Sequence, residues 1–414
     1  MYSYNQFVLK NGLRVIHLED KTRTTIVLNT LYNVGARDEN PNRTGFAHLF
    51  EHLMFSGSMN VAIFDKEVEE AGGQNNAFTN NEITNYYLVM PIENVETAFW
   101  LESDRMLALN INEKSLSIQQ GVVVEEFKQR CFNAPFGLLW HHVRSLVYKS
   151  SPYRWPTIGL NFHHVEEAKI ADVRSFYDTF YCPQNAIISV VGDIGLEETK
   201  LLAEKWFGGI TKSAQPNLNN YIEEPEQTER RFLETEDLSP NPAVFLVWRG
   251  PVFNDPKSIH LEVFSEVLGG SDVSPLQMEL VKKQQLFNSS ECFYLRGLDE
   301  GLFVLYGILN PSIMHTDGEK ALHEIIRKVT SGGDNTTSAF EGVKNRHVTN
   351  LLFEATQPMQ LAQKLCYYAN AGDLEQINHE PSIIEGLDMS DVLTTASATL
   401  RENNVSVIYY HPKK

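Results

Sequence analysis

The feature that most constrains the fold of this 414-residue chain is an order of strands and helices that occurs twice. In the first half, alternating and apolar runs predict antiparallel strands within residues 7–28 and further strands at residues 86–89 and 186–191. Helical periodicity predicts helices at residues 44–55, 64–71, 92–109 and 196–207.

The second half has the same order of elements. It predicts strands at residues 244–248, 303–306 and 405–410 and helices at residues 258–268 and 317–330. The similarity lies in the order of the elements and not in residue identity. We therefore expect an α+β fold of two similar domains, each a largely antiparallel sheet packed with helices.

A polar stretch that contains Pro216 and Pro225 separates the two halves. Such a stretch is typical of a linker, and we place the linker at residues 212–228. The expected domains are then residues 1–211 and residues 229–414.

The composition excludes some classes of function. The chain carries 53 acidic against 35 basic residues, a formal net charge of −18. Nucleic acid and anionic membranes select for basic surfaces, so neither is expected as the main partner. The excess acidity fits either plain solubility or an acidic cavity that favours basic peptides. The 4 cysteines form no CxxC pair, which argues against a cysteine-ligated zinc site.

The start of the sequence has no basic segment followed by an apolar one, as a signal peptide would. No run reaches the roughly 18 apolar residues of a membrane helix. Sparse cysteine use suits a reducing compartment. We therefore expect a cytoplasmic protein, or a periplasmic one if a leader was removed before Met1.

The sharpest motif is His48-Leu49-Phe50-Glu51-His52, an HxxEH arrangement inside the first expected helix. Residues four apart lie on one face of a helix, so His48 and His52 can bind one cation together. The carboxylate of Glu51 lies beside the same face, and Thr44 is a candidate N-cap. Two imidazoles and a nearby carboxylate are the parts of a hydrolytic zinc centre with Glu51 as general base.

A hydrolytic zinc centre needs a third protein ligand and keeps one position open. The apolar residues 122–124 lead into Glu125 and Glu126, and such a run can carry a carboxylate into a buried site. Spacing alone does not choose between these two glutamates. The same residues are also compatible with a histidine packed in a core helix and with a solvated, acidic helix turn.

Further segments match a known pattern. They are residues 34–39, 44–55, 72–79, 85–87, 155–159 and 181–193, which together span most of residues 1–210. In these segments the chain resembles the inverzincin zinc peptidases, the family of pitrilysin, insulin-degrading enzyme and the mitochondrial processing peptidase. The resemblance implies a mitochondrial processing peptidase-like fold, one Zn²⁺ per chain, an N-terminal metal-binding peptidase domain and an inactive C-terminal repeat.

The resemblance also assigns roles to single residues. The family's third zinc ligand is a glutamate in the mid-seventies of residues beyond the second histidine, and this spacing selects Glu126. Asn76, Ala77 and Phe78 resemble the family's edge strand, on which an extended peptide pairs as an additional strand. From the residues alone, this segment is equally compatible with a buried loop.

Two departures from the family pattern matter. Gln119 replaces a glutamate that many relatives carry seven residues before the zinc ligand, and it can still hydrogen-bond a histidine beside the metal. Val281 and Asn288 stand where relatives carry an arginine and a tyrosine that hold substrate and stabilise the oxyanion. The resemblance therefore implies the catalytic chain of a two-chain enzyme, completed by a homologous partner chain or by a second copy of this chain.

Two other functions are compatible with the sequence. One is a non-catalytic structural subunit of a larger complex, and the other is a metal-dependent hydrolase of substrates other than peptides. The complete metal motif favours the peptidase, although imidazole and carboxylate ligands also bind manganese or cobalt. In the second half, His260, Glu262 and Glu266 stand in place of HxxEH with a different spacing, which predicts a degenerate repeat without metal.

Overall fold

The computed structural model describes residues 2–211, 224–332, 336–354 and 356–413. The predicted linker, residues 212–228, lies outside the described residues from 212 to 223. The strands are β1 (Asn5–Val8), β2 (Arg14–Glu19), β3 (Thr25–Tyr32), β4 (Gln74–Thr79), β5 (Thr84–Pro91), β6 (Ala186–Gly192), β7 (Arg231–Asp237), β8 (Ala243–Gly250), β9 (Phe287–Leu295), β10 (Gly301–Leu309) and β11 (Ser406–Pro412).

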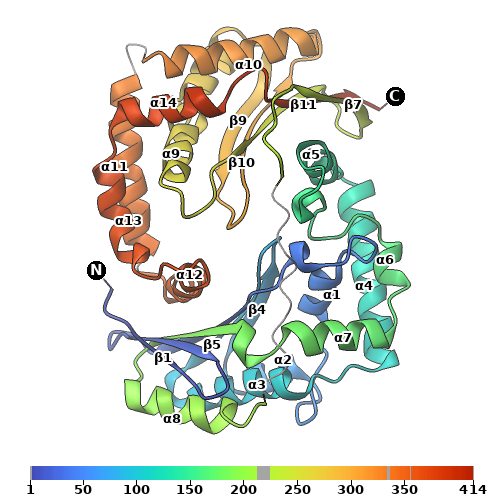
Figure 1. The fold of residues 1–414 in the computed structure, drawn as a ribbon, viewed down its shortest axis with the longest axis vertical. Helices are drawn as coiled ribbons and strands as arrows, with labels where there is room; N and C mark the ends of the chain where they lie inside the picture. The colour runs from blue at the N-terminus through green and yellow to red at the C-terminus, as the bar shows by residue number, and fades with distance from the viewer. Residues whose placement is uncertain (1, 212–223, 333–335, 355, 414) are drawn as a thin grey trace. The chain divides into compact units, whose positions relative to one another are not determined.

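Groups of helices lie between groups of these strands along the chain (Figure 1). They are α1 (Phe46–Leu53), α2 (Phe64–Glu70), α3 (Val95–Ala108), α4 (Glu113–Phe132), α5 (Leu139–Val147), α6 (His163–Glu166), α7 (Ile170–Phe180), α8 (Leu196–Phe207), α9 (Lys257–Gly269), α10 (His315–Thr330), α11 (Thr336–Glu354), α12 (Pro358–Asn370), α13 (Gln376–Glu385) and α14 (Met389–Thr399). Among the residues that the structure describes, none of these helices has the length and apolar character that a bilayer span requires.

The chain forms two compact units, neither of which is contiguous in sequence. The first contains residues 1–128, 155–220 and 352–379, and the second contains residues 129–154, 221–351 and 380–414. The domain boundaries expected from the sequence, at residues 211 and 229, stay a prediction.

The first unit is built on a six-stranded sheet with the order β1-β2-β6-β3-β5-β4. Strands β2 and β6 are parallel, and the other neighbours are antiparallel. Every residue of β6 is buried. Because successive side chains of a strand point to opposite faces, this burial requires cover on both faces of the sheet.

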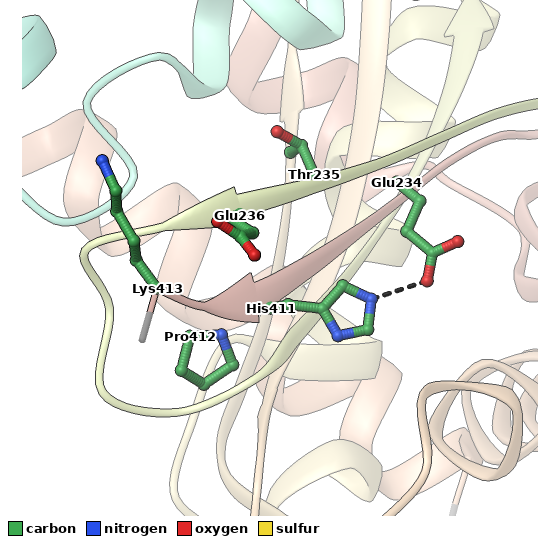
Figure 2. Close-up of a pocket in the computed structure, with 6 residues that line it drawn as sticks. All are labelled: Glu234, Thr235, Glu236, His411, Pro412 and Lys413. Carbon is green, nitrogen blue, oxygen red and sulfur yellow. Dashed lines mark hydrogen bonds and ion pairs between the residues drawn. The ribbon is translucent and has the colours of Figure 1, made fainter.

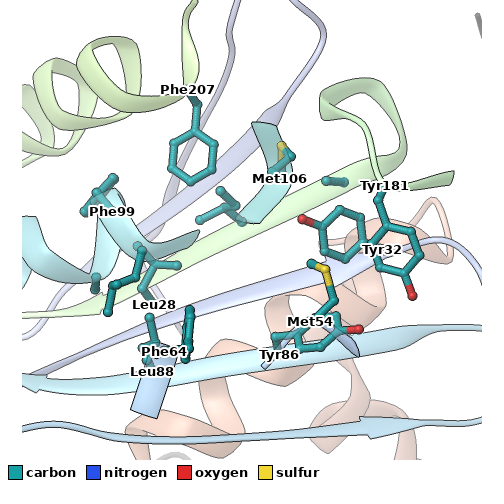
Figure 3. Packing of buried hydrophobic residues seen from close by; sticks show 14 of the residues in the cluster. Leu28, Tyr32, Met54, Phe64, Tyr86, Leu88, Phe99, Met106, Tyr181 and Phe207 are labelled. Atoms are coloured by element: carbon teal, nitrogen blue, oxygen red, sulfur yellow. The ribbon is translucent and has the colours of Figure 1, made fainter. Parts of the chain in front are cut away.

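Helices from different parts of the chain cover the two faces. On one face, Phe99 of α3 and Phe207 of α8 pack with Leu28, Tyr32 and Leu88 of the sheet (Figure 3). On the other face lies α12, whose Ala362 carbonyl accepts a hydrogen bond from Ser189 Oγ of β6 at 2.7 Å. The sheet of the first unit is thus completed by a helix from near the end of the chain.

The second unit repeats the strand order of the first. Its sheet runs β7-β11-β8-β10-β9, which corresponds to β2-β6-β3-β5-β4, and its one parallel pair is again the first. Val143 and Val147 of α5 pack on one face against Phe245 and Ile408. This sheet is therefore covered by a helix from the first half of the chain. The expected α+β fold with two similar, largely antiparallel sheets is confirmed.

A half-buried cluster of charges joins helices of the second unit. Glu262 and Glu266 lie one turn apart on α9 and face His347 of α11. The distance from His347 Nε2 to Glu262 is 3.9 Å, and that from His347 Nδ1 to Glu266 is 3.4 Å. Arg296 pairs with Glu262 at 3.2 Å and with Glu380 of α13 at 2.6 Å.

The charges of this cluster act on one another. Burial lowers the pKa of His347, but its bond to Glu266 and the charges of Glu262, Glu266 and Glu380 raise that pKa above the ordinary 6.5 overall. Burial raises the pKa of Glu266, but bonds from His347 and Arg346 lower it overall. Both shifts favour a protonated His347 beside an ionised Glu266.

We expect the stability contributed by His347 to depend on pH. Because its folded pKa is raised, the contribution is complete below about pH 6.5 and is lost as the pH rises through the folded pKa. Replacing His347→Gln should lower the free energy of unfolding by about 1–3 kcal/mol at pH 6 and by less at pH 9. Urea unfolding at the two pH values measures this difference.

The surface histidine His163 provides the control for that experiment. Its side chain is 53% exposed, so His163→Gln should change the free energy of unfolding little at either pH. An equal loss for His347→Gln at pH 6 and pH 9 would contradict the expected linkage.

Candidate metal centre

Helix α1 turns two histidines to the same side. Leu49, Phe50 and Leu53 bury the neighbouring sides of the helix in the core of the first unit, which fixes the helix's rotation. His48 and His52 lie one turn apart, with ring centroids 4.9 Å apart and an interplanar angle of 86°. The spacing of apolar residues in the sequence thus sets the direction of both imidazoles.

The start of α1 differs from the expected one. Gly45 is the N-cap with φ 90°, a left-handed conformation that glycine adopts without strain. The prediction that Thr44 caps this helix is wrong. Its Oγ1 instead accepts a hydrogen bond from the N–H of Leu160 at 2.8 Å. The carboxylate of Glu39 accepts the N–H groups of Gly45 and Ala47 at 2.9 and 2.8 Å. The sequence reasoning assigned no role to Glu39.

Helix α4 brings a third ligand group to the histidines. Glu126 Oε2 lies 3.6 Å from His48 Nε2 and 3.3 Å from His52 Nε2. The neighbouring Glu125 is exposed and pairs with Lys128 Nζ at 2.7 Å. Of the two glutamates that the sequence offered, the structure places Glu126 beside the histidines and Glu125 at the surface.

The three side chains fit a zinc ion. Two donors that each lie about 2.0–2.1 Å from zinc at the tetrahedral angle are about 3.4 Å apart, close to both observed distances. All three ligand atoms lie within 4.8 Å of one another. Within the described part of the chain, no other group of His, Cys, Asp or Glu meets this criterion. Two imidazoles and one carboxylate also form a donor set that zinc prefers.

Glu51 lies beside this group on α1 and is half-buried. Burial raises the pKa of Tyr86 and Tyr181, and the Glu51 carboxylate raises both further. The charge of Glu51 therefore acts on an aromatic wall shielded from bulk water. A carboxylate beside a metal site is suited to accept and return a proton.

The segment with Asn76, Ala77 and Phe78 is the strand β4 at the edge of the first sheet, and not a buried loop. It pairs with β5 on one side only and contacts α1. At its exposed side, the N–H of Ala77 donates to Asn76 Oδ1 at 2.8 Å. Phe78 is 38% exposed. The strand thus offers an apolar side chain and an outer backbone edge.

The residues at the two departures from the family pattern have ordinary surroundings. Gln119 lies on α4, and its amide donates a hydrogen bond to Ser56 Oγ at 3.2 Å. Val281 is half-buried against the core of the second unit, and Asn288 is exposed on β9. Their expected roles stay predictions.

In the second unit, the helices that correspond to α1 and α4 carry a different group of charged residues. Helix α9 follows β8 as α1 follows β3, and α11 follows β10 as α4 follows β5. Helices α9 and α11, which correspond to α1 and α4 in this order, carry Glu262, Glu266 and His347, and these side chains lie near one another. His260, which the sequence grouped with these glutamates, instead bonds to Thr395 Oγ1 at 2.8 Å.

A pocket of about 560 Å³ also lies in the second unit, along strands β7 and β11 (Figure 2). Glu234, Glu236 and His411 are among its lining residues. His411 Nε2 is already bonded to Glu234 Oε1 at 2.6 Å. These side chains do not meet the ligand-distance criterion that the three residues of the first unit meet.

Several known proteins and two family models are similar to this chain. The sequence model described as insulinase (peptidase family M16) matches residues 14–154, and the one described as peptidase M16 inactive domain matches residues 168–346. The zinc protease PqqE of Helicobacter pylori is 26% identical over 99% of this chain and 93% of its own length. A probable mitochondrial-processing peptidase subunit beta of Arabidopsis thaliana is 21% identical over 96% of this chain and 76% of its own. The crystal structure of a protease from Helicobacter pylori has a TM-score of 0.94 at 27% identity and covers 100% of both chains.

The two adjacent glutamates of α4 provide a matched test of the site. We expect Glu126→Gln to weaken zinc binding by more than about 100-fold, since losing even an outer partner of a ligand costs about 10–100-fold. Glu125→Gln should bind zinc as the unaltered chain does. Competition with a chromogenic chelator measures both affinities. Similar losses in the two variants would remove Glu126 from the ligand set.

Proposed function

The chain belongs to the M16 family of peptidases, the insulinase family, and from this premise we propose that it is a zinc-dependent endopeptidase. The proposed ligands are His48, His52 and Glu126, and the proposed base is Glu51. The observation that carries the proposal is the approach of Glu126 Oε2 to both imidazoles, at 3.6 and 3.3 Å. The relative named zinc protease PqqE supports zinc as the metal.

Each residue has a defined part in this proposal. A bound zinc ion would supply Lewis acidity that makes a water molecule nucleophilic near neutral pH. The Glu51 carboxylate accepts the proton of the attacking water and passes it to the nitrogen of the leaving amine. His48, His52 and Glu126 would hold the ion, and a hydrolytic zinc site of this kind keeps one position for water or substrate.

We place the peptide on β4. An edge strand has unpaired N–H and C=O groups, and an extended peptide binds to them as a further strand. The exposed N–H of Ala77 donates to the Asn76 side chain and not to a neighbouring strand. A peptide carbonyl would replace the Asn76 side chain there, and Phe78 would contact an apolar side chain. Because the contacts are mainly to backbone, the enzyme would accept many sequences.

A second chain completes the proposal. Val281 and Asn288 offer neither the guanidinium nor the phenol with which relatives hold substrate. The relative from Arabidopsis thaliana is named a subunit, which supports a multi-chain enzyme. The partner would be a homologous chain that carries the arginine and tyrosine, or a second copy of this chain.

We further propose a cytoplasmic location, which cell fractionation can test.

We expect Glu51→Gln to abolish peptide cleavage and to leave zinc binding intact. Loss of a general acid–base group costs about 10²–10⁴-fold in rate, and glutamine cannot accept the proton. Glu125→Gln, on the surface of α4, is the matched carboxylate control and should retain the rate. Zinc content per chain and turnover of a fluorogenic peptide panel are the two measurements. Appreciable turnover by the Glu51→Gln chain would exclude Glu51 as the base.

We expect the isolated chain to cleave the panel more slowly than the chain mixed with its homologous partner. The partner supplies donors for the developing oxyanion, and a single such donor contributes about 10²–10³-fold. Titrating the partner at constant zinc, with sedimentation to count chains, measures the gain. Full activity of a monomeric chain would contradict the two-chain proposal. Zinc binding without cleavage, even with the partner, would favour a structural subunit.

A further inference from the structure

Hydrogen bonds hold both ends of the segment that precedes α1, residues 36–39. Residues 36–38 form a short 3₁₀ helix, and the N–H groups of Ala36 and Arg37 donate to the carbonyls of Asn80 and Asn81, at 3.1 and 2.9 Å. These two carbonyls follow β4 directly. The Ala36 carbonyl in turn accepts Trp155 Nε1–H at 2.6 Å. The segment is therefore anchored to the end of the edge strand.

Glu39 ends this anchored segment and is 2% exposed. Its two carboxylate oxygens hold the backbone N–H groups of Gly45 and Ala47, at 2.9 and 2.8 Å. These groups belong to the N-cap and the first turn of α1, which would otherwise have no acceptor within the helix. His48 is the next residue after Ala47. One buried side chain thus joins the end of β4 to the turn that carries the first histidine.

A carboxyl group suits this position in either protonation state. Burial raises the pKa of Glu39 to about 8, although the N–H groups of Ala47 and Gly45 lower it. Both forms of a carboxyl group present two oxygens to the two N–H groups. A carboxamide presents one oxygen and one NH₂ group, so glutamine loses one of the two bonds and places a donor against a donor.

We propose that Glu39 is a positioning residue for the metal centre. It sets the position of the first turn of α1 along the helix axis and its rotation about that axis. It thereby sets where His48 and Glu51 lie relative to a peptide on β4. The part of this proposal that concerns the peptide rests on the proposed function, whereas the part that concerns His48 does not. Small displacements suffice for an effect, because a misplacement of about 1 Å can cost about 100-fold in rate.

The test compares two capping carboxylates. Glu39→Gln should weaken zinc binding of the metal-free chain by about 10-fold. This is the lower end of the range for losing an outer partner of a metal ligand, because Glu39 acts on His48 through the backbone of Ala47. The substitution should also lower kcat by about 10-fold or more and leave KM nearly unchanged. The control is Asp388→Asn, which alters the cap that Asp388 provides to Ser390 N–H of α14 in the second unit. This control should keep zinc affinity and kcat.

The measurements separate the possible results. Zinc affinity is determined by chelator competition, and kcat is corrected for the folded fraction by circular dichroism. Wild-type zinc affinity and wild-type kcat in Glu39→Gln would overturn the proposal and leave Glu39 a stabilising cap only. Should Glu39→Gln not fold, Glu39→Asp, which keeps the charge and shortens its reach, is judged by the same criteria. If the unaltered chain binds zinc but cleaves no peptide even with its partner chain, the proposed function fails, and the zinc affinities still decide the role of Glu39.

Discussion

The approach of one carboxylate to two imidazoles depends on which sides of two helices the core buries. Leu49, Phe50 and Leu53 bury one part of α1, and Val123 and Phe127 bury one part of α4. The ligand residues lie between these apolar positions, so the packing of the core sets where their donor atoms point. A well-packed interior deforms little. Apolar contacts, rather than contacts among the ligands, therefore hold the donor atoms at separations close to those of zinc ligands.

The two units have the same order of strands, but the numbers of histidines and glutamates in their charged groups are reversed. In the first, two histidines face one glutamate, and a metal ion would supply the positive charge. In the second, the group Glu262, Glu266 and His347 has two glutamates facing one histidine, and Arg296 and Arg346 supply the positive charge. Guanidinium groups form bidentate and bridging bonds with carboxylates and need no ion. In each unit, helices that correspond in this order thus bring opposite charges or metal-binding groups together, with different residues.

Local patterns in the sequence predicted much of the first unit and its site. The histidines followed from helical spacing, and the apolar runs of β3 and β6 predicted strands because both faces of the sheet are covered. The polar strand β4 has no apolar alternation, so only the family resemblance indicated it. Glu126 required the family spacing, since neighbouring glutamates of a helix look alike in sequence. The cap by Glu39 was missed because it spans a loop, whereas sequence signals for caps concern adjacent residues.

The cover of each sheet by a helix from the other half of the chain has a consequence for synthesis. During translation, the strands of the first unit's sheet leave the ribosome long before α12, so the face of that sheet that α12 covers stays exposed until the chain is nearly complete. Helix α5, in contrast, emerges before any strand of the sheet on which it packs. Folding cannot then proceed strictly from the N-terminus, as it does in many multidomain chains. A chaperone can bind the face that α12 has not yet covered. Two nascent copies close together can exchange α12 or α5, as in domain swapping.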